Sequence, residues 1–529
     1  MRRGFKIMSL FIPFILTASL NNHRSKTFHF TTRVMFLFVI VVVLLLSSCT
    51  RLPNPLQSTE LHEETSDALE QIANPPVITP REIDLYMAIA LAVKNNRDLR
   101  VKIMEAALAN QQVDLVRFGM LPKLAANAGY EQTDKYSPST SVTVTGGEAA
   151  AIGDSPTYST STEKKISKAD LGFTWNALDF GLSYIRAGQN ADRYLIAKEI
   201  ERKAIHNITR DVIIAYWNAV SANQILNDMT PVLERIDVAL QNSVYIESLL
   251  LDSPLEALKY QRTLLDIQFR LQNQRDELLD APVQLGKLMG LLPKEEYNLV
   301  ITDTPLRPTK MNLIVMEKNA LAYRPEMREN LYQQRISVED TKGSMLALIP
   351  GLQFNTTWTY SNNQYLLNSN NVNYGARIGA NLLDVFSVSS IKKASLARED
   401  IVAKQRLALA MTILSQVHLA NIHYAQSLDA FTTLENYYEV NVRIRDQYRR
   451  GKTLEKYGEL EIIREEANTL LAMMRKDNAY ADLQHSIGRI YASVGLDLVP
   501  QDVHMIDLLD LAKTIKNNFI NTWGEKNVE

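Results

Sequence analysis

One long amphipathic stretch, ITRDVIIAYWNAVSANQILNDMTPVLERIDVAL at residues 208–240, decides how this chain folds. Its apolar residues are spaced alternately four and three apart, as in the seam of a coiled coil. Helix-favouring residues continue on both sides, from about residue 183 to about residue 250, which predicts on the order of 100 Å of helix at ~1.5 Å per residue. We expect Pro231 to bend this helix without ending it, because the spacing continues through it. The seam positions are Ile208, Val212, Ala215, Ala219, Ala222, Leu226, Met229, Leu233, Ile236 and Leu240.

The composition is typical of a folded protein and argues against a nucleic-acid partner. Apolar residues make up 46% of the 529 residues and charged residues 22%, which suits globular structure. The formal net charge is −2, but the first 48 residues carry six basic residues and no acid. The remainder has 51 basic and 59 acidic residues, a net charge of −8. It therefore lacks the basic excess that nucleic-acid binding requires.

The single cysteine, Cys49, excludes an intrachain disulfide and a CxxC metal site. It closes a run of thirteen apolar residues at 34–46, too short for a comfortable membrane span, so residues 1–48 are interpreted as a signal peptide. Leu46-Ser47-Ser48-Cys49 resembles a bacterial lipobox, which implies cleavage before Cys49 and lipid on its sulfur. Thr50, rather than aspartate, follows, and this resemblance favours sorting to the outer membrane. The alternative is a short anchor helix with an incidental cysteine.

Residues 49–80 are interpreted as an acylated polar tether, rich in proline and without regular structure. Helical spacing resumes over residues 83–118 and ends at Leu121-Pro122. The period then changes to two: apolar Leu124, Ala126 and Ala128 alternate with small or polar residues, and the same alternation recurs at residues 170–177. Such alternation predicts strands with one apolar face and one polar face.

The chain then repeats itself. Leu121-Pro122 corresponds to Ile349-Pro350 at an offset of 228 residues, and Leu178-Asp179 corresponds to Leu383-Asp384 at an offset of 205. The first copy therefore carries 23 extra residues between its strands, in residues 137–162, which we expect to form an external loop. The distance from Asp179 to Gly290 and from Asp384 to Gly495 is 111 residues in both copies, which indicates a duplication. The expected boundaries are repeat 1 at 81–293, a linker at 294–310, repeat 2 at 311–500 and a C-terminal helical tail at 501–529.

The segment lengths predict the arrangement of each repeat. A helix of about 72 residues begins near Asp179, while the run at 256–290 has 35 residues and the first helix at 83–118 has 36. Stacked end to end, the two shorter helices together match the long helix in length. Each repeat is therefore interpreted as one long helix beside two helices of half its length, capped by a strand hairpin.

Residues 81–500 resemble the TolC family of outer-membrane efflux proteins. The resemblance is carried by the tandem repeat, by Leu-Pro leading into an alternating strand, and by Trp175-Asn176-Ala177-Leu178-Asp179-Phe180-Gly181 leading into the long helix. Repeat 2 adds Ala322-Tyr323-Arg324-Pro325-Glu326 and Tyr448-Arg449-Arg450-Gly451. The resemblance implies a fold that is mainly α, with long helical hairpins forming an α-barrel across the periplasm. It also implies a homotrimer in which four transmembrane strands per chain close a twelve-stranded β-barrel.

Membrane physics leads to part of the same conclusion. Four strands cannot close a barrel and open edges cannot face lipid, so several copies must contribute strands. The polar strand face would then line a wet lumen, and its alternative is the outer face of a soluble sandwich. The candidate lumen residues are Lys123, Asn127, Asp170, Thr174, Gln353, Asn355, Arg377 and Asn381.

No catalytic constellation is found in the sequence, so we expect neither enzyme activity nor a cofactor. Asp179-Phe180-Gly181 matches the metal-binding motif of protein kinases, but the sequence has neither the Gly-rich loop nor the catalytic loop that accompany it there. The three residues are therefore interpreted as a strand-to-helix turn. His418 and His423 are five apart, not on one helical face, and are more simply surface or packed residues than metal ligands.

A basic cluster precedes the predicted tip of the second hairpin. Asp446 lies within it, and the family resemblance places a constriction with aspartates at this end. The alternative is that the arginines simply face water. The tip or gate candidates are Arg443, Arg445, Asp446, Arg449, Arg450, Gly451 and, in repeat 1, Asp252.

The predicted function is a passive export duct of a tripartite efflux system, spanning the outer membrane and periplasm and gated at its periplasmic tip. The expected partners are outer-membrane lipid, a periplasmic adaptor protein and an inner-membrane pump that supplies the energy. Two alternatives stay open: a duct for secreted polypeptides of the type I kind, and a structural coiled-coil lipoprotein without a channel.

Overall fold

The computed structural model describes residues 55–73, 80–153, 156–248, 254–292, 295, 297–302, 312–452, 458–500, 503 and 505–521. The chain divides into two units, residues 1–72 and 73–529. The first unit contains all but the last residue of helix α2 (Ser58–Ala73), which exposes Leu61 and Leu69. The expectation that residues 49–80 lack regular structure is therefore wrong for this segment. It has neither glycine nor proline, so nothing in it breaks a helix.

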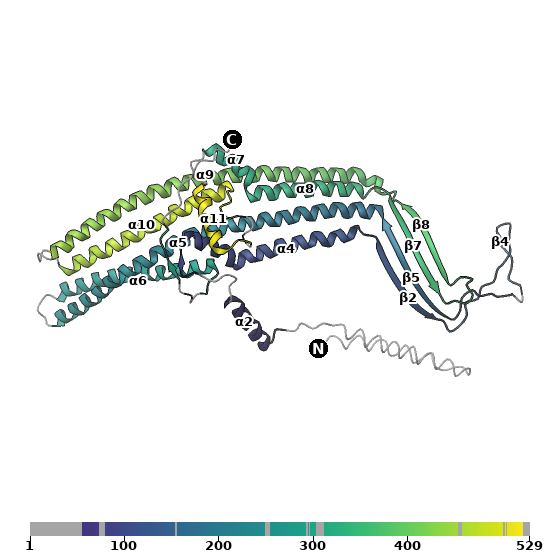
Figure 1. Cartoon of the computed structure of the whole chain (residues 1–529), viewed down its shortest axis with the longest axis horizontal. Coiled ribbons are helices and arrows are strands. Elements are labelled where there is room, and N and C mark those ends of the chain that lie inside the picture. The colour runs from purple at the N-terminus through teal and green to yellow at the C-terminus, as the bar shows by residue number, and fades with distance from the viewer. Residues whose placement is uncertain are drawn as a thin grey trace. The chain divides into compact units, whose positions relative to one another are not determined.

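The second unit contains the same succession of elements twice (Figure 1). The first copy comprises β1 (Glu82–Ile83), α3 (Leu85–Asn95), α4 (Arg97–Arg117), the 3-10 turn η1 (Phe118–Met120), β2 (Lys123–Gln132), β5 (Lys165–Asn176), α5 (Ala177–Ser248) and α6 (Pro254–Met289). The second comprises β6 (Asn298–Leu299), α7 (Leu313–Tyr323), α8 (Pro325–Leu346), β7 (Gly351–Ser361), β8 (Asn370–Gly379), α9 (Asp384–Lys452) and α10 (Glu459–Val494), followed by α11 (Leu508–Asn521). Helices α5 and α9 have 72 and 69 residues, and α6 and α10 have 36 each, which confirms the tandem helical hairpins.

The 4-3 seam explains why α5 is one unbroken helix. Val212, Ala219, Ala222 and Ile236 are fully buried in it, and the small alanines allow neighbouring helices to approach closely. The helix continues through Pro231, as predicted. Side-chain burial along this seam outweighs the local cost of one proline.

The expected first helix at 83–118 is two helices. The Asp84 carboxylate caps α3 by accepting a 2.7 Å hydrogen bond from the backbone N–H of Met87, and Asn96 caps α4 by accepting one of 3.0 Å from Leu99. Asn96 thus ends α3 and starts α4. Its side chain competes with the helix backbone, which is why asparagine favours caps over helix interiors. The same break occurs in the second copy at Arg324, where Pro325 starts α8.

Each 36-residue helix ends on a left-handed glycine beside that break. Gly290 has φ 73° and Gly495 has φ 79°. A Cβ on Gly495 would lie 2.8 Å from the backbone nitrogen of Arg324, and one on Gly290 would lie 2.6 Å from the carbonyl oxygen of Asn95. Only glycine fits these positions, so α6 meets the start of α4, and α10 meets the start of α8, end to end.

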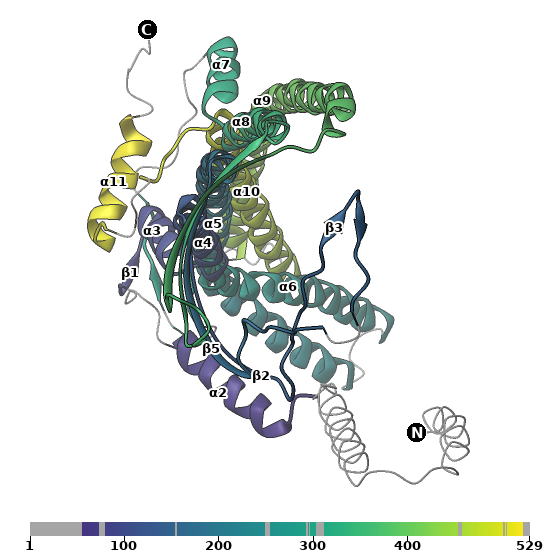
Figure 2. The same cartoon turned by 90° about the vertical axis from the view of Figure 1, so that its right-hand side faces the viewer.

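The helices form a curved row in the same order as the strands. Among the described residues, α4 and α6 pack on α5, α5 packs on α8 and α10, and α8 and α10 pack on α9. Viewed end-on, the row curves from α9 to α6, with α3 and α11 on its convex side (Figure 2). The main core lies between these layers, where Tyr86, Tyr491 and Phe519 are buried together. Helix α11 lies within the predicted C-terminal helical tail.

The strands form one antiparallel sheet in the order β2-β5-β7-β8. The residues between β2 and β5 include a small hairpin of β3 (Val144–Thr145) and β4 (Glu148–Ala149), and a bridge between Ser139 and Ser159. The segment expected to be an external loop therefore contains paired backbone of its own, outside the four-stranded sheet.

Candidate functional site

Seven of the eight predicted lumen residues share one face of the sheet. Directly opposed residues of an antiparallel pair lie on the same face, and the register places Lys123 opposite Thr174 and Thr174 opposite Asn355. The amide of Asn127 donates a 2.8 Å hydrogen bond to the Asp170 carboxylate across β2 and β5. A polar surface therefore crosses all four strands. It carries Lys123, Asn127, Asp170, Thr174, Gln353, Asn355 and Arg377.

The eighth residue, Asn381, lies beyond the end of β8, in the turn before α9. Its side chain donates a 2.7 Å hydrogen bond to Asp384 and accepts one of 3.2 Å from the backbone N–H of Leu383. The expectation that Asn381 continues the strand is therefore wrong. The asparagine shapes the turn from strand to helix, which is a common role for this side chain.

The opposite face of the sheet is apolar and aromatic. Leu124 of β2 is 69% exposed and Tyr374 of β8 is 81% exposed. No layer of described residues covers this face, so its large apolar groups would be exposed to water in a single soluble chain, which is unfavourable. Its other large residues are Tyr130, Leu171, Phe173, Phe354, Trp358, Tyr360, Val372 and Ile378.

Both edges of the sheet are open in the single chain. Within the described part of the chain, strands β2 and β8 are paired on one side only. A sheet with an apolar face and open edges is unsuitable both for water and for lipid, because unpaired backbone groups cannot enter hydrocarbon.

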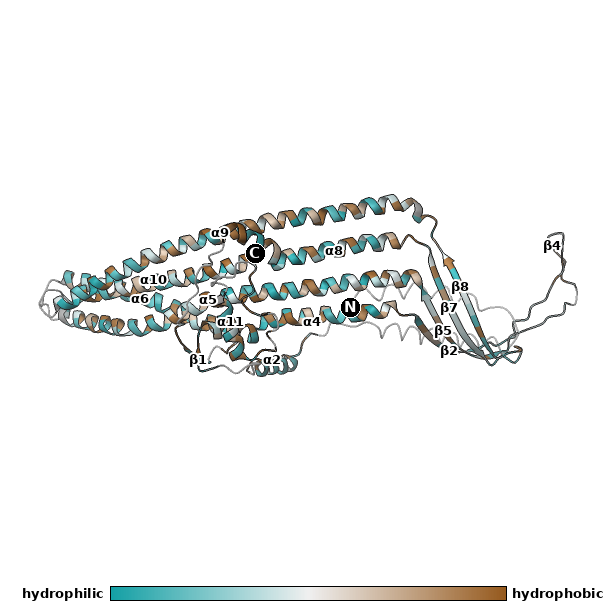
Figure 3. Cartoon of the chain, turned by 45° about the horizontal axis from the view of Figure 1, so that its top comes forward, coloured by the Kyte–Doolittle hydropathy of each residue, from teal (hydrophilic) through white to brown (hydrophobic). Residues whose placement is uncertain are grey.

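The two edges of the helical row are also apolar. On α4, Met104, Leu108 and Leu115 are between 59% and 70% exposed, although their spacing predicts a buried seam. On α6, Phe269 is 63% exposed. The other edge is α9, along which apolar residues recur over its whole length (Figure 3). They include Leu396, Leu407, Met411, Leu419, Ile422, Leu428, Tyr437, Val440 and Ile444.

The candidate gate residues lie at the end of α9, where it approaches the start of α10. Asp446 accepts hydrogen bonds of 3.0 and 2.9 Å from its neighbour Arg445. Arg443, Arg449 and Arg450 are exposed, while Gly451 is buried. Asp252 and Cys49 lie outside the described residues.

The links between helices at this end are made by residues that the sequence analysis did not select. Glu466 of α10 has a side chain only 3% exposed and accepts hydrogen bonds from Arg235 of α5 and, at 2.8 Å, from Arg449 of α9. Arg235 also donates a 2.6 Å hydrogen bond to Glu459. A buried carboxylate thus connects the hairpin of repeat 1 with both helices of the hairpin of repeat 2.

Electrostatics favour the charged state of this cluster. Burial alone would lower the pKa of Arg235, but its hydrogen bonds to Glu466 and Glu459 outweigh burial and raise it. The sequence contains a signal for Glu466, since it lies three residues after Ile463 and four before Leu470 on the buried face of α10. A charge at an apolar seam position requires a partner.

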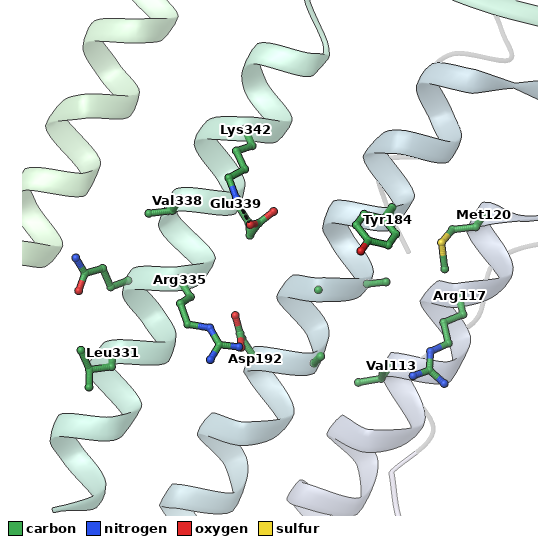
Figure 4. A pocket seen from close by; sticks show the side chains of 14 residues that line it. Val113, Arg117, Met120, Tyr184, Asp192, Leu331, Arg335, Val338, Glu339 and Lys342 are labelled. Carbon is green, nitrogen blue, oxygen red and sulfur yellow. Dashed lines mark hydrogen bonds and ion pairs between the residues drawn. The ribbon is translucent and has the colours of Figure 1, made fainter. Parts of the chain in front are cut away.

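A groove of about 840 Å³ runs along α5 between α4 and α8 (Figure 4). Ala187, Gly188 and Ala191 are among the residues that line it, and Asp192 pairs with Arg335 of α8 across it. Burial raises the pKa of Asp192, and the guanidinium of Arg335 offsets this only in part. The pair ties the two repeats together on the sheet side of the helical row.

None of the helices in the described part of the chain has both the length and the apolar character of a membrane span. At the level of sequence, no protein-family model and no curated protein matches the chain.

Solved structures with the same fold are outer-membrane channels. The channel CmeC of Campylobacter jejuni is 14% identical and aligns over 83% of this chain and 89% of its own, with a TM-score of 0.60. The outer-membrane channel OprN is 16% identical over 78% and 89%, with a TM-score of 0.58. The open state of the MtrE channel of Neisseria gonorrhoeae is 14% identical over 80% and 94%, also with a TM-score of 0.58. The predicted resemblance is therefore confirmed at the level of fold.

Proposed function

We propose that this protein is a passive duct that crosses the outer membrane and extends into the periplasm. The observation that carries the proposal is the sheet, whose polar face crosses four strands while its other face is apolar and its edges are unpaired. Such a sheet is stable only if copies join edge to edge, with the apolar face toward lipid and the polar face around water. Three copies would supply twelve strands.

The helical row supports the same assembly. Its α4 and α6 edge and its α9 edge both expose apolar residues along their length. Packing the α9 edge of one copy against the α4 and α6 edge of the next would bury both and continue the curved row into a closed tunnel. The joining of several copies into a closed ring is thus supported independently by the helices and by the strands.

We further propose that the tunnel rests closed at the α9–α10 end and is opened by partners. The partners would be a periplasmic adaptor and an energy-supplying pump of the inner membrane, as the resemblance to outer-membrane efflux proteins implies. The ionic links of Arg235, Glu459, Glu466 and Arg449 hold the two hairpins of one copy together at this end. Opening would require part of this cluster to separate.

Single-channel recording tests the duct. Purified protein inserted into planar bilayers should give small discrete conductance steps at rest and larger ones when urea on the tip side loosens the closed end. The detergent-solubilised particle should have three times the mass of one chain. A stable protein that never conducts, in the presence or absence of urea at the tip side, would instead support a structural coiled-coil lipoprotein.

We also propose that Cys49 is the acylated mature N-terminus, on the basis of the lipobox-like sequence before it. Metabolic labelling with a radioactive fatty acid should mark the wild type and leave Cys49→Ser unmarked. Label that persists in the variant would refute acylation at this residue. Function should persist in part, because the sheet itself anchors the protein.

A further inference from the structure

A cavity of about 310 Å³ lies where α5, α9 and α10 meet the residues that follow β6. Trp217 of α5, Phe431 of α9 and Tyr480 of α10 line it, together with Ile301 and Thr302. Its volume is at the lower end of the range of about 300–1,000 Å³ for small-molecule sites.

The three aromatic rings form one connected cage. The ring centroids of Trp217 and Tyr480 are 4.8 Å apart with planes at 87°, and those of Phe431 and Tyr480 are 5.3 Å apart at 52°. The three rings are therefore held in place by contacts with one another. Burial raises the pKa of Tyr480 to about 12, so its phenol stays neutral.

Trp217 contributes its ring to the wall of this cavity. The residue is only 7% exposed, and its indole N–H is buried without an acceptor among the described residues. Because this N–H has no accessible surface, a ligand in the cavity would contact the indole ring and not the N–H group.

The charges around the cage leave one negative group. Asp477 is already compensated, since it accepts a 2.9 Å hydrogen bond from Ser221 and lies 3.0 Å from the ammonium of Lys476. The Lys476 ammonium is also placed 4.7 Å from the ring centroid of Tyr438. Glu435 of α9 lines the same cavity and makes no ion pair with any described residue. Aromatic rings attract cations through their quadrupole, and a nearby carboxylate adds to this attraction.

We propose that this aromatic cage is a binding site for a small organic cation, such as a quaternary ammonium compound. The cation would lie against Trp217, Phe431 and Tyr480 near Glu435. The ligand would touch both repeats at once, because α5 belongs to the first and α9 and α10 to the second. This inference does not depend on channel activity.

Choline and 3,3-dimethylbutan-1-ol provide the test, because they share shape and hydroxyl and differ only in charge. Binding to the purified full-length protein is measured by saturation-transfer NMR titration and by tryptophan fluorescence. We expect choline to bind more tightly than the alcohol by about 3- to 30-fold, the range of a cation–π contact. Choline should also raise the thermal unfolding midpoint. Equal binding of the two compounds, or no binding of either, would overturn the proposal.

Substitutions then locate the site. Glu435→Gln should weaken choline binding by about 3- to 10-fold and leave the alcohol unaffected. Glu439→Gln, one turn further along α9 and outside the cavity, is the matched control and should change neither. Trp217→Phe should weaken the binding of both compounds and abolish the fluorescence response. Trp358→Phe in β7 should retain the binding of both compounds and the fluorescence response. Choline binding that is unchanged in Glu435→Gln and Trp217→Phe would overturn the assignment, and Glu435→Gln keeps the test valid if Trp217→Phe fails to fold.

Discussion

Nε of Arg449 donates a 2.8 Å hydrogen bond to Oε1 of Glu466. A half-exposed arginine of α9 is thereby bonded to a carboxylate of α10 that is almost fully buried. The same carboxylate receives Arg235 from the other repeat. Asp446, the acid selected from sequence, pairs only with the adjacent Arg445 among the residues for which contacts are described. The tip thus has a local pair on one helix and a buried link across three helices.

The buried link predicts a strong effect of Glu466→Gln. Removing one partner of a buried ion pair costs about 3–5 kcal/mol, and the partial exposure of both arginines reduces this to roughly 1–3 kcal/mol. We expect lower resistance to thermal unfolding and a higher resting conductance. Glu465→Gln, the preceding residue, is the control and should behave as wild type. Unchanged stability and conductance in Glu466→Gln would show that this cluster does not keep the tunnel closed.

Reversal of charge at Asp446 should have a smaller effect that adds up over three copies. A single exposed pair contributes ~0–1 kcal/mol, so Asp446→Arg should bias the gate by about 1–3 kcal/mol in a trimer. Such a bias corresponds to roughly a 5- to 150-fold change in the open population. Bilayer conductance should rise, cells should become sensitive to large antibiotics, and high salt should mimic the effect weakly. Normal trimers with wild-type conductance would remove Asp446 from the gate.

His485 of α10 predicts a pH dependence of stability. Burial, followed by the positive charges of Arg210 and Arg489, lowers its pKa to about 4. The unfolded chain, with a histidine pKa of about 6.5, binds the proton first, so stability is lost as the pH falls from about 6.5 to about 4. After allowance for solvent screening this amounts to roughly 1–2 kcal/mol. Thermal midpoints measured between pH 7 and pH 4 should fall less steeply in His485→Gln than in wild type or in His423→Gln, and parallel curves would contradict the assignment.

Two glycines of opposite character predict opposite effects. Gly495→Ala places a Cβ at φ 79° and 2.8 Å from Arg324, and should destabilise by about 1–3 kcal/mol. Gly188→Ala lies inside α5 with nothing within 4 Å of the new Cβ, and should stabilise by about 0.5–1 kcal/mol. Denaturant titration of both variants provides the comparison. A destabilised Gly188→Ala would indicate that its open space is filled in the assembly.

The segment between β2 and β5 should be dispensable. Its paired backbone, including the bridge from Ser139 to Ser159, lies outside the four-stranded sheet. Deletion of residues 139–160 should therefore leave trimer formation and conductance intact. Loss of trimers on size-exclusion chromatography would place this segment in the barrel wall.

The fold was predictable because its signals are long and repeated. The 4-3 seam of α5 continues through Pro231, and the alternation that begins at Leu124 and recurs at residues 170–177 fixes which strand face is polar. The break at Asn96 was missed because one capping side chain interrupts an otherwise regular period. Arg235 and Glu466 were missed because their contact joins positions 231 residues apart, and no local pattern reports such a contact.

The end-to-end meeting of α6 with α4 and of α10 with α8 has a mechanical consequence. Helices α5 and α9 run unbroken from the sheet to the tip, whereas the helices beside them are jointed at Gly290 and Gly495. Arg202 braces the second joint through hydrogen bonds of 2.7 Å to the carbonyl of Tyr323 and 3.1 Å to that of Gly495. Continuous helices resist bending, but abutting ends allow a small relative rotation. We expect a rotation applied at the tip to be taken up at these two joints, which would leave the four-stranded sheet undisturbed while the helices at the tip move.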